Sequence, residues 1–412
     1  MPREGVATYR RLVESMRGLH AQGVDYPARM ASRCRQRGLS PWISLRMNDV
    51  HNNDILDHPF HGQFWVEHPH LFRKGATGYF ANALDYAHPE VRDLYLALIR
   101  ETLDRYDIDG LELDFLREPY LFSPGKEAEG APLLTAWLRG VRRLVQETAA
   151  RRGHPVRLGV RVPSRPETAK ALGLDTIAWA REGLVDLVVP APRWATLEFD
   201  MPIAEWRRLL RPFPKVMLAG GLEILYRPHP GAKPASVSPE HAYAAASAVW
   251  QAGAHAVYLF NYFQDGSWPP ETYRKVLMTL GSPERLSEAP RWHAVTYRDI
   301  VGPDEEYRPP LPAVGRTVRF DVPVSPAPGR DWPVRVILGL EDAPEPPAIR
   351  VNGEEGVLEK AEPHEAVYSV PGVAFEGRAR AEISLRAGQP VRVVKVEVRV
   401  TPPEAATVER KR

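Results

Sequence analysis

The stretch DGLELDFLR, at residues 109–117, decides the fold more than any other part of this sequence. Its apolar residues alternate with polar ones, so Leu111, Leu113 and Phe115 share one face, while Glu112 and Asp114 share the other. A barrel strand has two such faces, one against the surrounding helices and one toward the barrel axis. We therefore predict that this acidic pair points inward near the C-terminal end of a strand, where the active sites of such barrels lie.

Similar strand-length segments recur on both sides of this stretch, and amphipathic helices separate most of them. Two helices are predicted within residues 8–38, and later ones at 89–106, 133–151 and 239–251. The predicted strands start near residues 42, 79, 109, 157, 185, 216 and 256. Strands that alternate with helices form right-handed βαβ units and a parallel sheet. The sequence therefore predicts an α/β fold, a TIM barrel of the (β/α)8 type.

Seven predicted strands are one fewer than the eight that close the common barrel. Because the sequence opens with helices, we expect the first strand of the barrel to be missing and the native start to lie upstream. The alternative is that one strand is too irregular to be recognised. The opening residues have no signal-peptide core, and the sequence leaves the localisation open.

Helical periodicity ends near residue 283, where short alternating segments separated by turn residues replace it. Runs such as 317–324, 334–340 and 391–400 are typical of a β-sandwich. Because this region has few aromatic residues, we expect it to cap the barrel, with sugar binding as the alternative. The predicted organisation is a barrel at 1–283, a linker at 284–312, a β-sandwich accessory domain at 313–401 and a disordered tail at 402–412.

The composition excludes several classes of partner. The 54 basic residues nearly balance the 52 acidic ones, so we expect neither nucleic acid nor an anionic membrane as the partner. No apolar run approaches the roughly 20 residues of a membrane span. The single cysteine, Cys34, excludes an intrachain disulfide and a cysteine metal cluster. We expect no cofactor and no metal, and the sequence leaves the oligomeric state open.

A polar segment, RMNDVHNND at residues 46–54, directly follows the first predicted strand. It forms a βα loop at the same end of the barrel as Asp114, and its polar groups suit hydrogen bonds to sugar hydroxyls. Its oxygen atoms would also suit calcium, but the spacing differs from that of helix–loop–helix calcium loops, and an ordinary capped loop is a further alternative. The residues predicted to bind substrate here are Arg46, Asn48, Asp49 and His51.

Further candidates lie at the ends of other predicted strands. Arg161 alternates with apolar neighbours and is expected to face inward, where it and Arg117 can balance the acidic pair. Glu223 follows two glycines after the strand near residue 216, and Asn261 and Tyr262 end the strand near residue 256. The alternatives are a structural network of glutamate and arginine inside the barrel and an ordinary loop glutamate at position 223.

Several of these segments resemble the glycosyl hydrolase-like 10 group of bacterial glycosidases. The similarity is carried by DYAHPEVR at 85–92 and YDIDGLELDF at 106–115, and RMND at 46–49 and the region 173–186 also fit it. It extends over roughly residues 8–280 and implies a TIM barrel with glycosidase activity. Because most members of the group are named by similarity alone, the resemblance carries little information about the substrate.

A more distant similarity is to alpha-amylase-type barrels, whose fourth strand carries glycine, arginine and the nucleophilic aspartate at alternate positions. The glycine is present here, and Asp114 matches the nucleophile. Glu112 replaces the arginine, and Arg161 lies on the next strand, where an acid/base glutamate is expected. The proton donor must therefore come from elsewhere, and we assign Glu223 to this role, with Asp49 as the runner-up.

We accordingly expect hydrolysis of a glycosidic bond in a poly- or oligosaccharide, so that the partner is a carbohydrate. Asp114 would act as nucleophile or base, Glu112 would tune it or contact substrate, and Glu223 would be the acid. Arg117 and Arg161 would hold carboxylate charge or recognise an acidic or sulfated sugar. Two other functions remain open: a carbohydrate-binding barrel without catalysis, and a barrel enzyme such as a lyase that acts on a non-sugar substrate.

Overall fold

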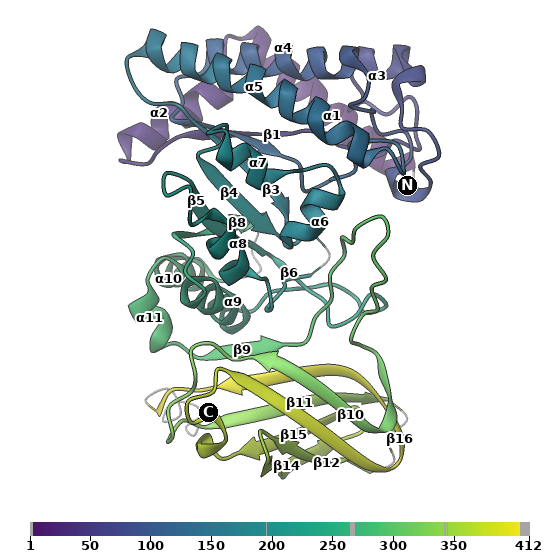
Figure 1. Cartoon of the computed structure of the whole chain (residues 1–412), viewed down its shortest axis with the longest axis vertical. Helices are drawn as coiled ribbons and strands as arrows, with labels where there is room; N and C mark the ends of the chain where they lie inside the picture. Colours follow the sequence, from purple (N-terminus) through teal and green to yellow (C-terminus); the bar gives the residue numbers. More distant parts are fainter. Residues whose placement is uncertain (1–2, 195, 264–267, 342, 344, 404–412) are drawn as a thin grey trace. The chain divides into compact units, whose positions relative to one another are not determined.

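The computed structural model describes residues 3–194, 196–263, 268–341, 343 and 345–403 (Figure 1). The chain divides into two compact units, which are described one at a time. The first comprises Met1–Val189, Leu209–Val216 and Gly302–Asp304, and the second comprises Pro190–Arg208, Met217–Val301 and Glu305–Arg412. Most of the predicted tail, residues 404–412, lies outside the described residues.

Strands and helices alternate along the first unit. Its parallel strands follow the order β1-β2-β3-β4, with β1 at the edge. The strands are β1 (Trp42–Arg46), β2 (Gly110–Asp114), β3 (Arg157–Pro163) and β4 (Leu187–Ala191), whose end enters the second unit. The helices are α1 (Arg3–Ala21), α2 (Tyr26–Gln36), α3 (Gln63–Glu67), α4 (Pro89–Arg105), α5 (Glu127–Arg152), α6 (Pro166–Ala171) and α7 (Thr176–Arg181), with short 3-10 helices η1 (Pro69–Leu71) and η2 (Gly78–Phe80).

Local signals in the sequence explain where these helices begin and end. Proline stands in the first turn of α2, α4 and α6. Backbone N–H groups in this turn make no hydrogen bond within the helix, so proline, which lacks an N–H group, costs nothing there. The Asp25 side chain accepts a hydrogen bond from the Ala28 amide at 3.1 Å and so caps α2. At its other end, α5 stops at Gly153, whose φ of 74° lies in the left-handed region that favours glycine.

The second unit contains a parallel pair of strands, β5 (Met217–Glu223) and β8 (Ala256–Phe260). Close packing explains the two glycines of β5. A Cβ atom at Gly220 would lie 2.6 Å from the side chain of Val249 in α9, and one at Gly221 would lie 2.3 Å from the Cβ of Ala191. The remaining elements are α8 (Ile203–Leu210), whose end enters the first unit, β6 (Leu225–Tyr226), β7 (Ala235–Ser236), α9 (Pro239–Gln251), α10 (Pro270–Leu280) and α11 (Pro283–Ser287).

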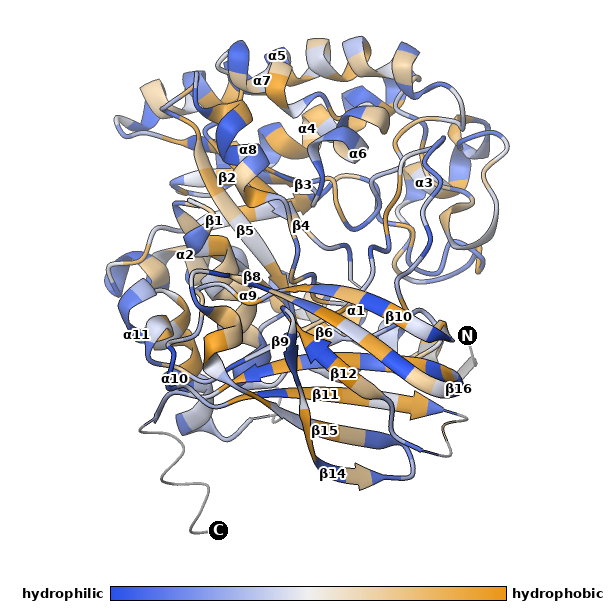
Figure 2. Ribbon diagram, turned by 60° about the horizontal axis from the view of Figure 1, so that its bottom comes forward, coloured by the Kyte–Doolittle hydropathy of each residue, from blue (hydrophilic) through white to orange (hydrophobic). Residues whose placement is uncertain are grey.

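The C-terminal part of the second unit is an antiparallel sheet of eight strands. Its longest strand, β16 (Arg380–Val400), pairs with β12 and β10 through its first half and with β11 and β9 through its second. Hydrophobic and hydrophilic residues alternate along these strands, so one face builds a core and the other meets solvent (Figure 2). The other strands are β9 (Arg291–Ala294), β10 (Ala313–Pro323), β11 (Val334–Glu341), β12 (Ala348–Val351), β13 (Glu354–Glu355), β14 (Val357–Glu362) and β15 (Glu365–Val370), with a 3-10 helix η3 (Gly372–Phe375).

These observations confirm the predicted fold class. Parallel strands alternate with helices as in a TIM barrel that lacks strands, and an antiparallel β domain follows. The strand predicted at 79–85 was wrong. Residues 78–80 form a 3-10 helix, and Leu84 makes only an isolated bridge to Phe72. Asn82 has a φ of 59°, which interrupts an extended chain. The predicted domain boundaries stay predictions.

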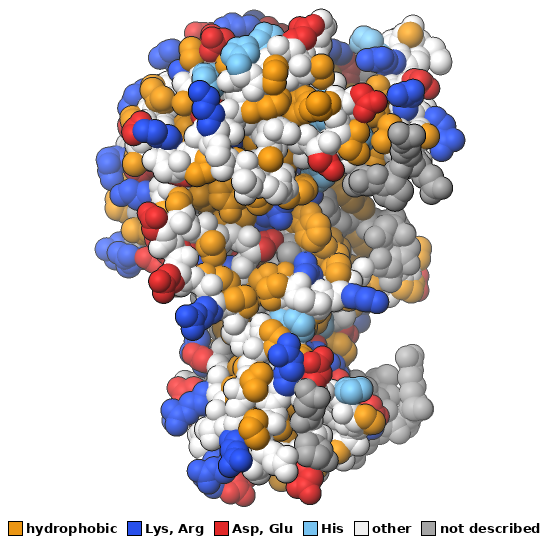
Figure 3. Space-filling model, turned by 90° about the vertical axis from the view of Figure 1, so that its right-hand side faces the viewer, with side chains coloured by type: hydrophobic (Ala, Val, Ile, Leu, Met, Phe, Trp, Pro, Cys, Tyr) orange, Lys and Arg blue, Asp and Glu red, His pale blue; other side chains and the backbone are white. Residues whose placement is uncertain are grey.

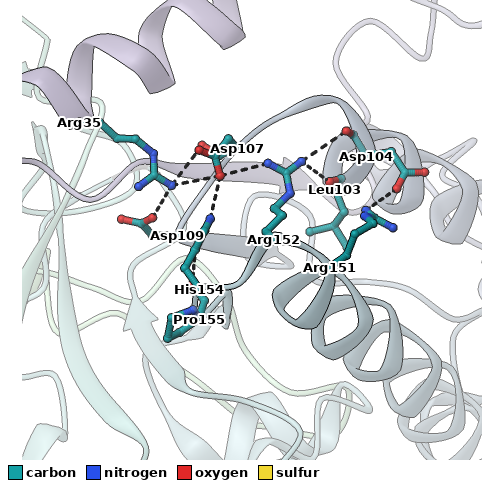
Figure 4. Close-up of polar contacts among 9 residues, drawn as sticks. All are labelled: Arg35, Leu103, Asp104, Asp107, Asp109, Arg151, Arg152, His154 and Pro155. Atoms are coloured by element: carbon teal, nitrogen blue, oxygen red, sulfur yellow. Dashed lines mark hydrogen bonds and ion pairs between the residues drawn. The ribbon is translucent and has the colours of Figure 1, made fainter.

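A polar network holds the N-terminal ends of β2 and β3 in the first unit (Figure 4). The carboxylate of Asp107 binds Arg152 at 3.1 Å and His154 at 2.7 Å. Arg35, in α2, bridges Asp107 at 3.3 Å and Asp109 at 2.7 Å. The hydrogen bond to Asp107 raises the pKa of His154 above its ordinary value. Because this network lies at the end of the strands opposite to that of barrel active sites, its role is structural.

Basic and acidic side chains are interspersed over the face of the molecule that Figure 3 shows. This distribution agrees with the formal net charge of +2. Among the described residues, no helix combines the length and the apolar character that crossing a membrane requires.

Candidate functional site

Two rows of side chains cross the carboxyl ends of β1, β2 and β3 in the first unit. The register aligns Asp114 with Arg46 on one side and Arg161 on the other. One step deeper, it aligns Glu112 with Ser44 and with a glycine of β3. Residues aligned in neighbouring strands project to the same face of the sheet. Asp114 is therefore the carboxylate nearest to the strand ends, and Glu112 lies below it.

The upper row contains a buried ion pair. Only 3% of the Asp114 side chain is exposed, and the Arg161 side chain is fully buried. The Nε and Nη2 atoms of Arg161 donate to the two carboxylate oxygens of Asp114 at 2.9 and 2.8 Å. The Leu116 amide donates to the same carboxylate at 3.1 Å. Because the contact is bidentate, it fixes both the position and the plane of the carboxylate.

The lower row contains a hydrogen bond between Ser44 and Glu112. The Ser44 hydroxyl donates to Oε1 of Glu112 at 2.7 Å, and Glu112 is 3% exposed. Ser44 and Arg46 belong to the edge strand β1 and are exposed, whereas their partners on β2 are buried. Solvent therefore reaches the β1 members of the two rows, whereas the carboxylates of β2 are shielded.

Four polar residues form a chain beside the upper row. Arg46 donates to Asp49 at 2.8 Å, and the Nη2 atom of Arg117 lies 2.9 Å from Nε2 of His51. Since a guanidinium can only donate, Nε2 of His51 accepts, and the ring proton sits on Nδ1. That nitrogen lies 2.5 Å from Oδ1 of Asp49 and donates to it. This geometry assigns the tautomer of His51.

These hydrogen bonds stabilise the charged form of Asp49. Burial would raise the pKa of this carboxyl, but hydrogen bonds from the side chain of His51, from Arg46 and from the backbone of His51 lower it well below its ordinary value. An ionised carboxylate with these donors suits hydrogen bonding to a ligand. It does not suit proton donation.

A further carboxylate, that of Glu118, lies close to Asp49 and His51. Glu118 was not identified from the sequence as a candidate site residue. It is 2% exposed, and the Tyr79 hydroxyl donates to it at 3.4 Å. One ligand atom each from Asp49, His51 and Glu118 lie within 4.8 Å of one another, a spacing that a metal ion would accept. However, two arginines already donate to members of this group, and their positive charge opposes a cation. The signal in the sequence was an acidic residue in the loop that follows β2, four positions after Asp114.

Asn48, predicted to contact substrate, instead fixes the loop itself. Its side-chain amide donates to the Leu84 carbonyl at 3.0 Å and accepts from the Leu84 amide at 3.1 Å. It also donates to the carbonyl of Tyr120 at 3.2 Å. Asn48 is 3% exposed, so these bonds satisfy a buried group and join three loops of the first unit.

The other predicted site residues belong to the second unit. Glu223 ends β5 with 1% exposure, and its carboxylate accepts from the Ile224 amide at 3.0 Å. The Tyr262 hydroxyl donates to the backbone carbonyl of Glu223 at 3.4 Å. Burial raises the pKa of Tyr262, and the charge of Glu223 raises it further, so the phenol stays protonated. Asn261, next to it, adopts a left-handed conformation with a φ of 59°.

The structure thus gathers the predicted residues into two groups. Glu223, Asn261 and Tyr262 lie together at the ends of β5 and β8 in the second unit. The first unit holds the larger group, which consists of Arg46, Asn48, Asp49, His51, Glu112, Asp114, Arg117 and Arg161.

The alternation of parallel strands with helices, with polar side chains at the carboxyl ends of the strands, defines a TIM-barrel type of α/β fold. Residues 6–131 match the family model of glycosyl hydrolase-like 10. This match confirms the resemblance seen in the sequence, and the matched segment includes Asp49, Asp114 and Glu118.

Solved structures of glycosidases also match the chain at low similarity. An Anoxybacillus alpha-amylase is 11% identical, over 88% of this chain and 78% of that one, with a TM-score of 0.36. A family GH18 chitinase from Chromobacterium violaceum is 11% identical, over 90% and 76% of the two chains, with a TM-score of 0.35. A GH36 alpha-galactosidase from Geobacillus stearothermophilus, solved with raffinose, is 11% identical over 90% of this chain and 46% of its own, with a TM-score of 0.34. No curated protein matches the chain.

Proposed function

We propose that this protein hydrolyses a glycosidic bond of a poly- or oligosaccharide, with Asp114 as the nucleophile or base. One observation carries the proposal: a buried carboxylate, held in a fixed plane by Arg161, lies at the carboxyl end of a barrel strand. The family match, over residues 6–131, includes this residue. Glycoside hydrolysis needs a carboxylate of defined position beside the anomeric carbon, as nucleophile or as the base that activates water.

The second group required is a proton donor, and Glu223, which the sequence analysis assigned to this role, stays a prediction. Glu223 ends a barrel strand and is almost completely buried, as befits a carboxyl that delivers a proton in a site without bulk water. The first unit offers an alternative in Glu118. We assign Asp49 to substrate binding, because its lowered pKa opposes proton donation.

The test is a screen of aryl glycosides and polysaccharides with the full chain and with Asp114→Asn. We expect the parent to release product and the variant to be inactive at a temperature where both are folded. An aryl glycoside with fluorine at carbon 2 distinguishes the two roles of Asp114. A nucleophile would carry the sugar mass on the peptide containing residue 114, whereas a base would stay unlabelled. Activity retained by Asp114→Asn would refute the assignment.

A second candidate function is carbohydrate binding without catalysis. It is favoured by the saturation of Asp114, whose two oxygens accept from Arg161 and from the Leu116 amide. In that case the pair is a structural bridge between β2 and β3. Binding of an oligosaccharide that survives Asp114→Asn, together with no turnover by the parent on any substrate, would support this function.

A further inference from the structure

The outer face of the C-terminal sheet carries a groove of about 630 Å³ that the proposed active site does not involve. It runs over β12, β16 and β10, which are neighbouring strands. The register centres it on Ser384, which pairs with Arg350 on one side and with Arg319 on the other. In the adjoining row Arg386 lies between Ala348 and Thr317.

This arrangement explains the shape of the groove. Short side chains, those of Ser384, Ala348 and Thr317, form its floor, and the three long arginine side chains rise around them. Two strand spacings separate Arg350 from Arg319, which is about 10 Å between their backbones.

The groove has an excess of positive charge. Its lining contains three arginines and one carboxylate, that of Glu355, which pairs with Arg350 at 2.6 Å. Arg319 and Arg386 form no ion pair with any residue that the structure describes. Guanidinium groups bind carboxylates and sulfates through two parallel hydrogen bonds, and a hydroxyl floor adds further donors.

We propose that this groove binds an anionic polysaccharide, through the carboxylate or sulfate groups of its sugars. None of the described lining residues is aromatic, so recognition rests on charge and hydrogen bonding in place of ring stacking. The next row along the sheet contains Asp321 and Glu382, which limits the basic region to two rows. The densely spaced phosphates of a nucleic acid would be repelled by this acidic row. An acidic polysaccharide with more widely spaced charges can place its anionic groups beside the arginines and leave neutral groups beside the acidic row.

The experiment is native gel electrophoresis of the full chain in gels containing dextran sulfate, polygalacturonate or neutral dextran. We expect retardation by an anionic polymer, which weakens as salt is added, and none by dextran. Whether the sulfated or the carboxylated polymer is preferred identifies the group that is bound. The variant Arg319→Gln/Arg350→Gln/Arg386→Gln is expected to bind at least about tenfold more weakly, since three charged contacts are lost together.

A matched control removes the same number of charges elsewhere on the sheet. Arg335 and Lys360 are exposed, Arg392 is half-buried, and all three lie outside the groove, so changing them to Gln is expected to leave the retardation unchanged. Equal binding by the groove variant and this control would overturn the proposal, as would no retardation of the parent by either anionic polymer. Stronger retardation by single-stranded DNA than by the polysaccharides would also overturn it. Because hydrolysis is not measured, failure here is distinct from failure of the proposed active site.

Discussion

Replacing Asp114 with Asn tests the buried ion pair as well as the chemistry. The substitution keeps the shape but removes the charge, and it replaces one of the two acceptor oxygens that Arg161 uses. Both side chains are almost completely buried, so the guanidinium is left with a single acceptor where water cannot replace the other. Breaking such a pair costs about 3–5 kcal/mol, and the oxygen that Asn retains places the expected loss near 3 kcal/mol.

The assay is thermal unfolding followed by circular dichroism. For a unit of roughly 200 residues, a loss of about 3 kcal/mol corresponds to a fall in Tm of about 6–12 °C. The control is Glu182→Gln, which removes the charge from an ion pair with Arg139 that has the same bidentate geometry but is exposed to solvent, and we expect its Tm to stay close to that of the parent. If Asp114→Asn melts within 1–2 °C of the parent, by this same relation, the pair contributes little and our reasoning about its burial is wrong.

Three further outcomes follow from other parts of the structure. The free energy of unfolding should fall as the pH drops below about 6.5, because burial lowers the pKa of His293 in the folded protein while the same histidine in the unfolded chain still takes up a proton. The pKa of Glu397 in the folded protein is lowered to about 2, so this glutamate causes a further loss of stability below about pH 4.5. His293→Leu should reduce the first part of this loss in urea titrations at several pH values; the remainder comes from His58, His229 and His255, whose folded pKa values burial also lowers. Asp175→Ala removes the cap of α7 and should cost about 1 kcal/mol in urea unfolding. Gly220→Ala should cost about 1–3 kcal/mol in the same assay, because its methyl group would meet Val249 at 2.6 Å.

The strands that could be predicted are those with two contrasting faces or a continuous apolar run. The alternation in residues 109–117 placed Phe115 on the helix side of β2, and its ring indeed packs against that of Trp179 in α7, with the centroids 5.8 Å apart. The false strand at 79–85 shows the limit of this approach. Its composition suits a strand, but a single left-handed residue, Asn82, breaks the extended chain, and composition does not report a backbone dihedral angle.

Loop residues were harder to predict, because no periodicity fixes their direction. Asn48 looked like a ligand for sugar hydroxyls, yet its amide is used to hold the backbone of Leu84. Glu118 carried no strand pattern, yet its carboxylate lies close to the imidazole of His51 and the carboxylate of Asp49. A polar side chain in a loop can satisfy a neighbouring backbone or face a ligand, and only the path of the loop decides between these.

The register of the sheet explains why the partner of Asp114 could be anticipated only in part. Alternation predicts the face of each strand, so Arg161 was expected on the side of the acidic pair. It does not predict the stagger between strands, which decides which residues stand at the same level. The observed stagger sets Arg46, Asp114 and Arg161 in one row, but Arg46 turns to Asp49, which leaves Asp114 to Arg161. Arg46 and Arg161 therefore stand at the same level on either side of Asp114 and yet take different partners, so the ion pair of Asp114 follows from the path of the loop that carries Asp49 as well as from the sheet.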